Sequence, residues 1–256
     1  MKYFPQLITL SLPMTYSRPY TVRFLSKEQV AKDAYSFYFE RPKDFEFLSG
    51  QYNQWTLPIT ATDGRGSSRY FTISSSPLEK DKIAFTTKII RSDFKKALLN
   101  LKSNDEIKVF GPMENFSFDE VNPLPRVFIA GGIGITPFHS ILSYAAAKNL
   151  TMPLTLIASF SHPDEMVFHK ELSNLATQHA NIKIIYTITD TENSQVVWTG
   201  ETGRVSKDLI KKYIPDSTQA LFYVAGSPAM KEATKIMLKE MKITDEHILT
   251  EQFTGY

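Results

Sequence analysis

The chain has 256 residues, enough for one large domain or two of ordinary size. It is 42% hydrophobic with a formal net charge of +2, which excludes a disordered chain and argues against a nucleic-acid-binding protein. It contains no cysteine, so disulfides, thiolate metal sites and iron–sulfur clusters cannot occur within it, and we expect a reducing, cytoplasmic compartment. Residues 1–19 are expected to form an N-terminal arm, because their apolar run is broken by Pro5 and Pro13 and is too short to span a bilayer.

Residues 20–121 form the first predicted domain. Runs rich in aromatic and β-branched residues alternate with Gly, Pro, Asp and Ser clusters, such as DGRGSS at 63–68. Short, regularly spaced strands of this kind predict an antiparallel barrel or sandwich. One helix is expected, with Ser92 as its N-cap. The strands are expected within residues 21–42, 50–58, 68–77 and 82–90, and the helix within 92–101.

Residues 122–256 form the second predicted domain, which begins at the segment NPLPR. Apolar strands alternate here with amphipathic helices, a pattern that predicts βαβ units and a mostly parallel, doubly wound sheet. The strands are expected at 127–130, 154–160, 182–189 and 220–226, and the helices at 137–148, 164–179, 206–214 and 228–241. The predicted fold is a two-domain protein, with the antiparallel β domain followed by the α/β domain.

The segment FIAGGIGITPF, residues 128–138, places three glycines between a strand and a helix. Such a turn lies at the carboxyl edge of a parallel sheet, where free N–H groups and the helix dipole can hold a phosphate. Gly132 and Gly134 would let the backbone approach that phosphate, Thr136 can cap the helix, and Pro137 suits its first turn. A tight turn without a ligand accounts for the same residues.

This loop resembles the nicotinamide-dinucleotide loop of the ferredoxin–NADP reductase superfamily. Four further segments resemble motifs of that family in the same order, over about residues 20 to 256: Arg69 to Thr72, Gly111 to Phe116, Gly226 to Pro228, and Glu251 to Tyr256. The resemblance implies a flavin on the barrel, with FAD expected in preference to FMN, and NADPH or NADH on the second domain. It also implies hydride transfer between the nicotinamide and the flavin.

The resemblance gives the barrel residues specific roles. Arg69 would bind the flavin phosphate, Phe71 would pack against the isoalloxazine ring, and Thr72 would offer its hydroxyl to flavin N5. The start of the Ser92 helix would donate N–H groups to the pyrophosphate. Each residue also has a purely structural interpretation, as a surface arginine, a core aromatic, a strand threonine and a helix cap.

Further cofactor-binding residues are expected on the same grounds, and Tyr256 is expected to lie over the flavin as a second catalytic residue beside Thr72. The others are Tyr70, Lys88, Ser159, His162, Gly226, Ser227, Pro228 and Phe253. Three departures from the family pattern are evident: residues 89–91 lack its glycine, Glu114 replaces another glycine, and Ala225 replaces a cysteine.

No acidic residue follows the strand at 154–160, where Ser159, Ser161 and His162 stand instead, so NADPH is the expected nucleotide. The resemblance implies a flavin-dependent oxidoreductase that passes electrons to a separate acceptor: ferredoxin, flavodoxin, another carrier or a small molecule. One alternative is a flavin-binding electron-transfer or regulatory subunit with little turnover of its own. Another is a dinucleotide-binding module without redox chemistry. No nucleic-acid partner and no membrane span are expected.

Overall fold

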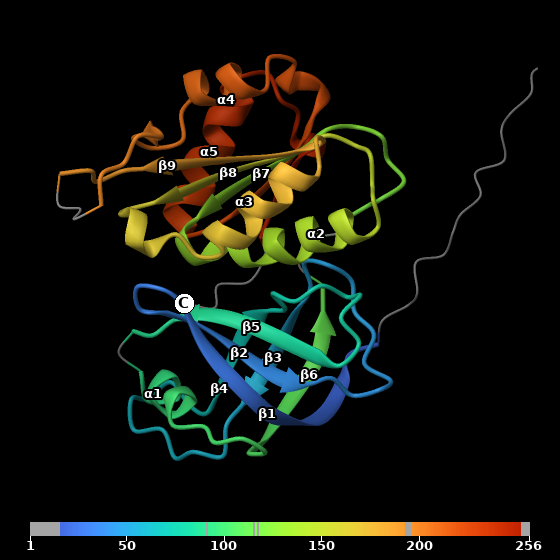
Figure 1. Ribbon diagram of the computed structural model, residues 1–256, viewed down its shortest axis with the longest axis vertical. Helices are drawn as coiled ribbons and strands as arrows, with labels where there is room; N and C mark the ends of the chain where they lie inside the picture. The colour runs from blue at the N-terminus through green and yellow to red at the C-terminus, as the bar shows by residue number, and fades with distance from the viewer. Residues whose placement is uncertain (1–15, 91, 115, 117, 193–195, 252–256) are drawn as a thin grey trace, which may run out of the picture.

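The computed structural model describes residues 16–251 apart from positions 91, 115, 117 and 193–195. Figure 1 shows these residues in two blocks, a β structure from the first half of the chain and an α/β structure from the second half. Each block is built on a six-stranded sheet, the first antiparallel and the second parallel. The predicted fold class is therefore confirmed.

The first sheet has the strand order β4-β3-β6-β1-β2-β5. An isolated bridge between Ile73 and Phe85 joins the β4 edge to the β5 edge and closes the sheet into a barrel. Its strands are β1 (Arg18–Ala31), β2 (Ala34–Glu40), β3 (Tyr52–Thr56), β4 (Ser68–Thr72), β5 (Lys82–Lys88) and β6 (Glu106–Met113).

Alternating side chains fill the barrel with aromatic rings. Trp55 is fully buried, with its ring centroid 4.6 Å from that of Phe39 and 4.7 Å from that of Phe85. Helix α1 (Asp93–Leu99) adds Phe94 and Leu98 to this core. The Ser92 hydroxyl accepts a hydrogen bond from the backbone N–H of Lys95 at 3.1 Å, so the predicted N-cap is confirmed.

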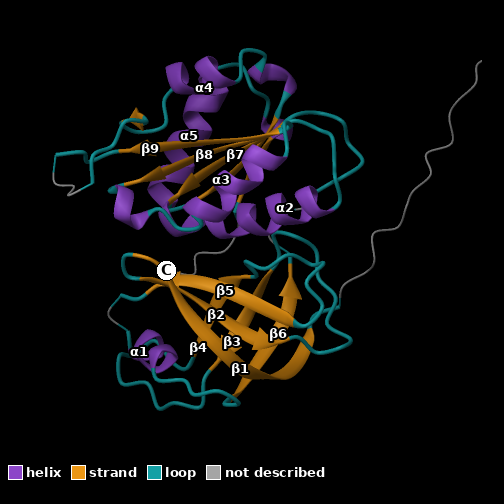
Figure 2. Cartoon of the chain, viewed as in Figure 1, coloured by secondary structure: helices purple, strands orange, loops and turns teal. Residues whose placement is uncertain are grey.

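The second sheet is doubly wound, with the order β10-β9-β8-β7-β11-β12. Helices α2 and α3 pack on one face, and α4 and α5 on the other (Figure 2). The strands are β7 (Arg126–Gly131), β8 (Leu154–Phe160), β9 (Ile182–Ile188), β10 (Glu201–Thr202), β11 (Leu221–Ala225) and β12 (Ile248–Thr250). The helices are α2 (Thr136–Ala147), α3 (His169–Gln178), α4 (Lys207–Tyr213) and α5 (Pro228–Glu240).

Some elements differ from the prediction. Strands β6, β10 and β12 were not expected; β6 lies at the centre of the barrel sheet, whereas β10 and β12 form the two edges of the parallel sheet. Helix α3 begins at His169 and not at residue 164, because a short 3-10 turn at Pro163–Glu165 precedes it. Phe168 ends this connection in the left-handed region, with φ of 59°, which separates the turn from the helix.

The two blocks are joined by polar contacts from helix α2. His139 Nδ1 lies 2.7 Å from the carbonyl oxygen of Ser74, and the Ser140 hydroxyl donates to the carbonyl of Ser75 at 2.7 Å. An apolar contact adds to these bonds, because Phe116, which follows the barrel, stacks on Phe138 of α2 with ring centroids 5.6 Å apart. The barrel is therefore held against α2, which itself packs on the sheet.

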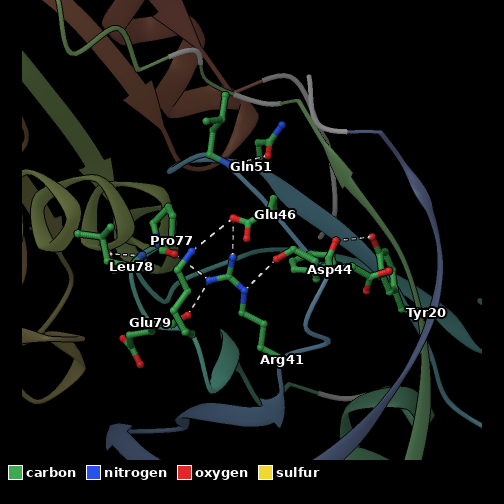
Figure 3. A network of polar contacts seen from close by, with 12 residues as sticks. Tyr20, Arg41, Asp44, Glu46, Gln51, Pro77, Leu78 and Glu79 are labelled. Atoms are coloured by element: carbon green, nitrogen blue, oxygen red, sulfur yellow. Dashed lines mark hydrogen bonds and ion pairs between the residues drawn. The ribbon is translucent and has the colours of Figure 1, made fainter. Parts of the chain in front are cut away.

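A buried arginine braces the loops at the rim of the barrel (Figure 3). The Arg41 guanidinium donates to the carbonyl oxygens of Phe45, Pro77 and Glu79 at 2.6 to 2.8 Å. It also pairs with the carboxylate of Glu46 at 3.1 Å. All three guanidinium nitrogens of Arg41 thus have protein partners, which identifies this side chain as structural.

The His139 contact should make the joint between the blocks sensitive to pH. Its ring faces two acceptors, the Ser74 carbonyl and the Glu171 carboxylate, which lies 2.8 Å from Nε2. Both ring nitrogens therefore have a partner, one in the barrel and one on helix α3. The hydrogen bond from His139 lowers the pKa of the Glu171 carboxyl, and Lys82 adds a smaller effect of the same sign.

His139→Leu is therefore expected to lower the free energy of unfolding by about 1–2 kcal/mol at neutral pH. The Glu171 part of this contribution is present above the ordinary carboxyl pKa and is lost as the pH falls through the lowered pKa of Glu171. Urea unfolding at several pH values measures the difference between wild type and variant. The difference should shrink in acid, and Glu171→Gln should remove that pH dependence. A difference that stays constant with pH would contradict the assignment.

Candidate functional site

A cavity of about 240 Å³ lies between the barrel and the glycine loop of the second sheet. We call it the barrel cavity. Its wall brings together predicted site residues from both halves of the chain, namely Tyr70, Phe71, Thr72, Lys88, Gly132, Gly134, Thr136 and Ser227. The remaining lining residues are Thr86, Thr87, Ile90, Lys95, Gly131, Ile133 and Glu251.

Strand β4 supplies an apolar ring and a hydroxyl to this cavity. Phe71 stacks on Phe85 of β5, with ring centroids 4.4 Å apart and ring planes 7° from parallel. This contact holds the Phe71 ring in place. The Thr72 hydroxyl is buried and has no hydrogen-bond partner among the described residues. A buried hydroxyl without a partner is energetically unfavourable, which suits a position where a bound polar group supplies the missing bond.

Arg69 on the same strand differs from Arg41 in how its donors are used. Its Nη1 donates to the carbonyls of Arg65, Gly66 and Ser68 at 2.7 to 3.0 Å, and so holds the loop before β4. Its Nη2 is buried without a hydrogen-bond partner among the described residues, and the nearest carboxylate oxygen, from Asp63, lies 3.8 Å away. Burial lowers the pKa of the Arg69 guanidinium, an unfavourable setting that a nearby anion would relieve.

A second cavity, of about 430 Å³, lies at the carboxyl ends of the parallel strands. We call it the sheet cavity. Its polar wall contains Ser159 near the end of β8, Ser161 directly after β8, Thr189 after β9 and Arg204 after β10. The two cavities share Lys88, Gly131, Gly132 and Ser227, so they meet at the glycine loop. This is the edge of a doubly wound sheet at which ligands bind, where β7 has β8 on one side and β11 on the other.

The glycines of the loop have different structural roles. Gly132 has φ of +53°, and a Cβ added there would meet nothing within 4 Å, so its open side is available to a ligand. Gly134 instead packs against the next strand, since an added Cβ would lie 2.7 Å from the backbone of Ala225 and Gly226. The expectation that Gly134 keeps space clear for a phosphate was therefore wrong: the glycine is needed for contact between two backbone segments.

The prediction that Thr136 caps a helix was also wrong. A 3-10 turn, Gly132–Ile135, comes between β7 and α2, and Thr136 is the first residue of α2. Its hydroxyl donates to the carbonyl of Ile133 at 3.1 Å. Pro137 lies in the first turn as expected, because its missing N–H has no helical partner at that position.

The Gly226–Pro228 segment starts helix α5 beside the glycine loop. Gly226 has φ of +153°, and the Ser227 hydroxyl caps the helix by accepting from the N–H of Met230 at 3.3 Å. Ser227 lines both cavities, whereas Gly226 and Pro228 line neither. Ser92 also lines neither cavity, so its observed role is that of a helix cap.

Lys88 stands where the two cavities join. Its ammonium pairs with the Glu165 carboxylate at 2.8 Å, which links β5 of the barrel to the turn before α3. A second pair, between Lys32 and Asp164 at 3.3 Å, ties the same turn to the hairpin that joins β1 and β2. Two ion pairs thus connect the barrel to the turn before α3, next to the junction of the two cavities.

His162 does not line either cavity. Its Nδ1 lies 3.2 Å from the carbonyl oxygen of Asp190, so the ring faces the loop after β9. Two cations line the sheet cavity, Lys88 and Arg204, and Arg204 was not predicted from the sequence. The only sequence signal for Arg204 is its position two residues after β10, a strand that was itself not predicted.

The remaining sequence predictions concern the C-terminal aromatic residues, metal sites and membrane spans. Phe253 and Tyr256 lie outside the described residues, so their expected roles remain predictions. Within the described part of the chain, no cluster of His, Asp and Glu side chains could hold a metal ion. No helix in that part is long and apolar enough to cross a membrane.

Comparison with known proteins gives two domain matches. A family model described as an oxidoreductase FAD-binding domain matches residues 21–118, and one described as an oxidoreductase NAD-binding domain matches residues 128–235. The glycine betaine monooxygenase reductase subunit of Chromohalobacter salexigens is 25% identical over 91% of this chain. The chain spans 64% of that relative's length and 60% of the Pseudomonas aeruginosa protein of the same name.

Two solved structures have the same fold. A cytochrome P450 reductase from Amycolatopsis superposes with a TM-score of 0.80 and 19% identity, covering 93% of this chain and 70% of that one. A ferredoxin–NADP+ reductase from Neisseria gonorrhoeae with bound FAD and NADP superposes with a TM-score of 0.74 and 20% identity, covering 91% and 98% of the two chains. The barrel matches the FAD-binding family and the parallel sheet matches the NAD-binding family, in that order. The chain therefore consists of an oxidoreductase FAD-binding domain followed by an oxidoreductase NAD-binding domain, and it has the fold of the ferredoxin–NADP+ reductase structure.

Proposed function

We propose that the chain is an FAD-dependent NADPH oxidoreductase that delivers electrons to a separate acceptor. The observation that carries the proposal is the junction of the two cavities at Lys88, Gly131, Gly132 and Ser227. Hydride transfer requires the donor and acceptor rings to be in contact, and ligands in the two cavities would meet at that junction.

The barrel residues would hold the flavin. Arg69 lines neither cavity, but its Nη2 has no hydrogen-bond partner among the described residues and could bind the flavin phosphate. Phe71 offers an apolar face, and the Thr72 hydroxyl has no hydrogen-bond partner in the described part of the chain. A bound flavin supplies the redox chemistry, since it accepts a hydride from a reduced nicotinamide and can release the electrons to an acceptor. The protein contributes binding, orientation and a polar contact to the ring.

The sheet residues would hold the nucleotide, with NADPH favoured over NADH. Arg204 lines the sheet cavity and has no hydrogen bond or ion pair to a described residue. The one carboxylate in the same wall, that of Glu165, is paired with Lys88. A guanidinium without a partner among the described residues, in the same cavity wall as Ser159 and Ser161, suits the 2′-phosphate that distinguishes NADPH from NADH.

Arg204→Leu is therefore expected to raise the NADPH KM by about tenfold or more, because a charge-assisted contact to the phosphate is lost. The NADH KM should stay within about twofold of the wild-type value, because NADH lacks that phosphate. Steady-state kinetics with an artificial electron acceptor measures both constants. His162→Asn is the matched control and should change neither constant, because His162 lines neither cavity. Equal changes with both nucleotides would remove Arg204 from the phosphate site.

The acceptor is proposed to be a separate molecule. The 256 residues contain no cysteine, so they cannot hold a thiolate-bound iron–sulfur cluster to receive the electrons. Similar proteins are named as reductase subunits or components of monooxygenases, among them the glycine betaine and propane enzymes. By this analogy we propose an electron-carrier or oxygenase protein as the acceptor.

Anaerobic reduction tests the proposed function. The protein purified with its flavin should lose its yellow colour when NADPH is added in the absence of oxygen, and should regain it when air is admitted. A protein that binds flavin but is not bleached by NADPH or NADH would be an electron-transfer or regulatory subunit. A protein that binds nucleotide but no flavin would be a binding module, and the proposal would fail.

A further inference from the structure

Lys95 extends from helix α1 into the wall of the barrel cavity. Its ammonium donates one hydrogen bond, to the carbonyl oxygen of Lys88 at 2.7 Å. No carboxylate among the described residues lies within ion-pair distance of it, whereas the next lysine, Lys96, pairs with Asp93 at 3.9 Å and is exposed. The Lys95 ammonium thus faces the cavity with donor capacity that no described residue uses.

Two arginines contribute positive charge around Lys95. Arg69 has its unpartnered Nη2, and the charges of Arg65 and Arg69 both act on Lys95. Burial is the largest influence and, with the two arginines, lowers the pKa of Lys95 to about 8. A desolvated ammonium beside two guanidinium groups is unfavourable unless an anion lies among them.

The two carboxylates between the loop before β4 and the start of α1, those of Asp63 and Asp93, are already engaged. Asp63 accepts hydrogen bonds from the N–H groups of Arg65 and Asp93, both at 3.0 Å. Asp93 accepts from the N–H and the hydroxyl of Thr62, both at 2.8 Å. Both acids therefore fix the loop before β4 to the start of α1, and Asp63 reaches Arg69 only at 3.8 Å.

We propose that the Lys95 ammonium binds the phosphate of the flavin nucleotide, sharing it with Arg69. The inference rests on the proposed flavin site and assigns a residue that the family pattern did not suggest. The segment before Ser92 lacks the glycine of the family, and α1 has only seven residues, so its N-terminus is a poor phosphate site by itself. A lysine in the first turn supplies the positive charge that such a short helix does not.

Flavin titration of the full-length apoprotein tests this assignment, with binding followed by quenching of flavin fluorescence. FAD and riboflavin are compared, because riboflavin has the same ring and no phosphate. Lys95→Met should weaken FAD binding by about tenfold to a hundredfold and change riboflavin binding by less than about twofold. Lys95→Arg should retain FAD binding within a few-fold. Lys96→Met, the matched control on the same helix, should behave like the wild type.

The pH dependence gives an independent readout. FAD binding to the wild type should weaken from about pH 7 to about pH 9, as free Lys95 loses its proton near its lowered pKa of about 8. Lys95→Arg and Lys95→Met should both lack this slope, because neither side chain titrates in that range.

Three results would overturn the inference. Equal weakening of FAD and riboflavin by Lys95→Met, with a lower melting temperature, would mean that Lys95 only braces the end of β5 through the Lys88 carbonyl. Unchanged FAD binding would show that the phosphate lies elsewhere while leaving the flavin site itself intact. A wild-type protein that binds neither FAD nor riboflavin would remove the proposed function, and this inference with it.

Discussion

Arg69→Met should release the flavin from the purified protein. The substitution removes a buried guanidinium nitrogen, Nη2, that has no hydrogen-bond partner among the described residues, so a phosphate bound there loses a charge-assisted hydrogen bond. Such a bond contributes about 1.5–3 kcal/mol, which corresponds to roughly tenfold to more than a hundredfold in FAD affinity. Equilibrium dialysis or fluorescence titration with FAD measures the loss.

Arg41→Met is the control for this prediction. Both arginines are buried in the barrel, and both donate to backbone carbonyls of neighbouring loops. Arg41 has all three nitrogens engaged by the protein, so its loss should lower the free energy of unfolding by about 1–3 kcal/mol and leave FAD affinity of the folded protein unchanged. If the two variants lost flavin to the same extent, Arg69 would be a second structural arginine.

Arg69 and Lys95 should not act independently. Both are proposed to contact one phosphate, and each raises the cost of burying the other when no anion is present. The double variant should therefore lose less FAD affinity than the sum of the two single losses, as contacting residues do in double-mutant cycles.

The parts of the fold that the sequence predicted are those governed by local pattern. Strand β8 was expected at residues 154–160, where the structure has it, because a continuous apolar run is typical of a parallel strand buried on both faces. The cap at Ser92 was predictable because it depends on bonds within four residues. The two-domain order followed from the change of pattern near residue 122.

The parts that were missed depend on contacts between distant segments. Strand β10 has two residues and exists because it pairs with β9, so no local pattern marks it, and Arg204 after it was missed for the same reason. His162 was chosen from its place after β8, but its ring faces Asp190 and not the sheet cavity. Lys95 bonds to the Lys88 carbonyl of β5 and lies within the field of Arg65 and Arg69, from the loop before β4 and from β4, which the helix pattern of α1 does not reveal.

Gly134 is a further residue whose role depends on a distant segment of the chain, and its substitution should have a large effect on stability. The glycine loop was recognised from its spacing, yet the spacing does not distinguish a glycine that faces a ligand from one that packs against backbone. An added Cβ at Gly134 would lie 2.7 Å from Ala225 and Gly226, whereas one at Gly132 would meet nothing within 4 Å. The two positions should therefore respond differently to substitution.

Gly134→Val is expected to destabilise the protein by about 3 kcal/mol or more, because the branched side chain must push the 3-10 turn away from the end of β11. The melting temperature should fall by roughly 6–12 °C for a chain of this size. Gly132→Ala should cost only about 1–2 kcal/mol for its left-handed backbone and leave the protein folded. Its Cβ points into the space where the two cavities meet, so it should weaken nucleotide binding measured by titration of NADP+ into the flavin-loaded protein. If Gly132→Ala bound nucleotide normally while Gly134→Val remained fully stable, the roles assigned to the two glycines would both be wrong.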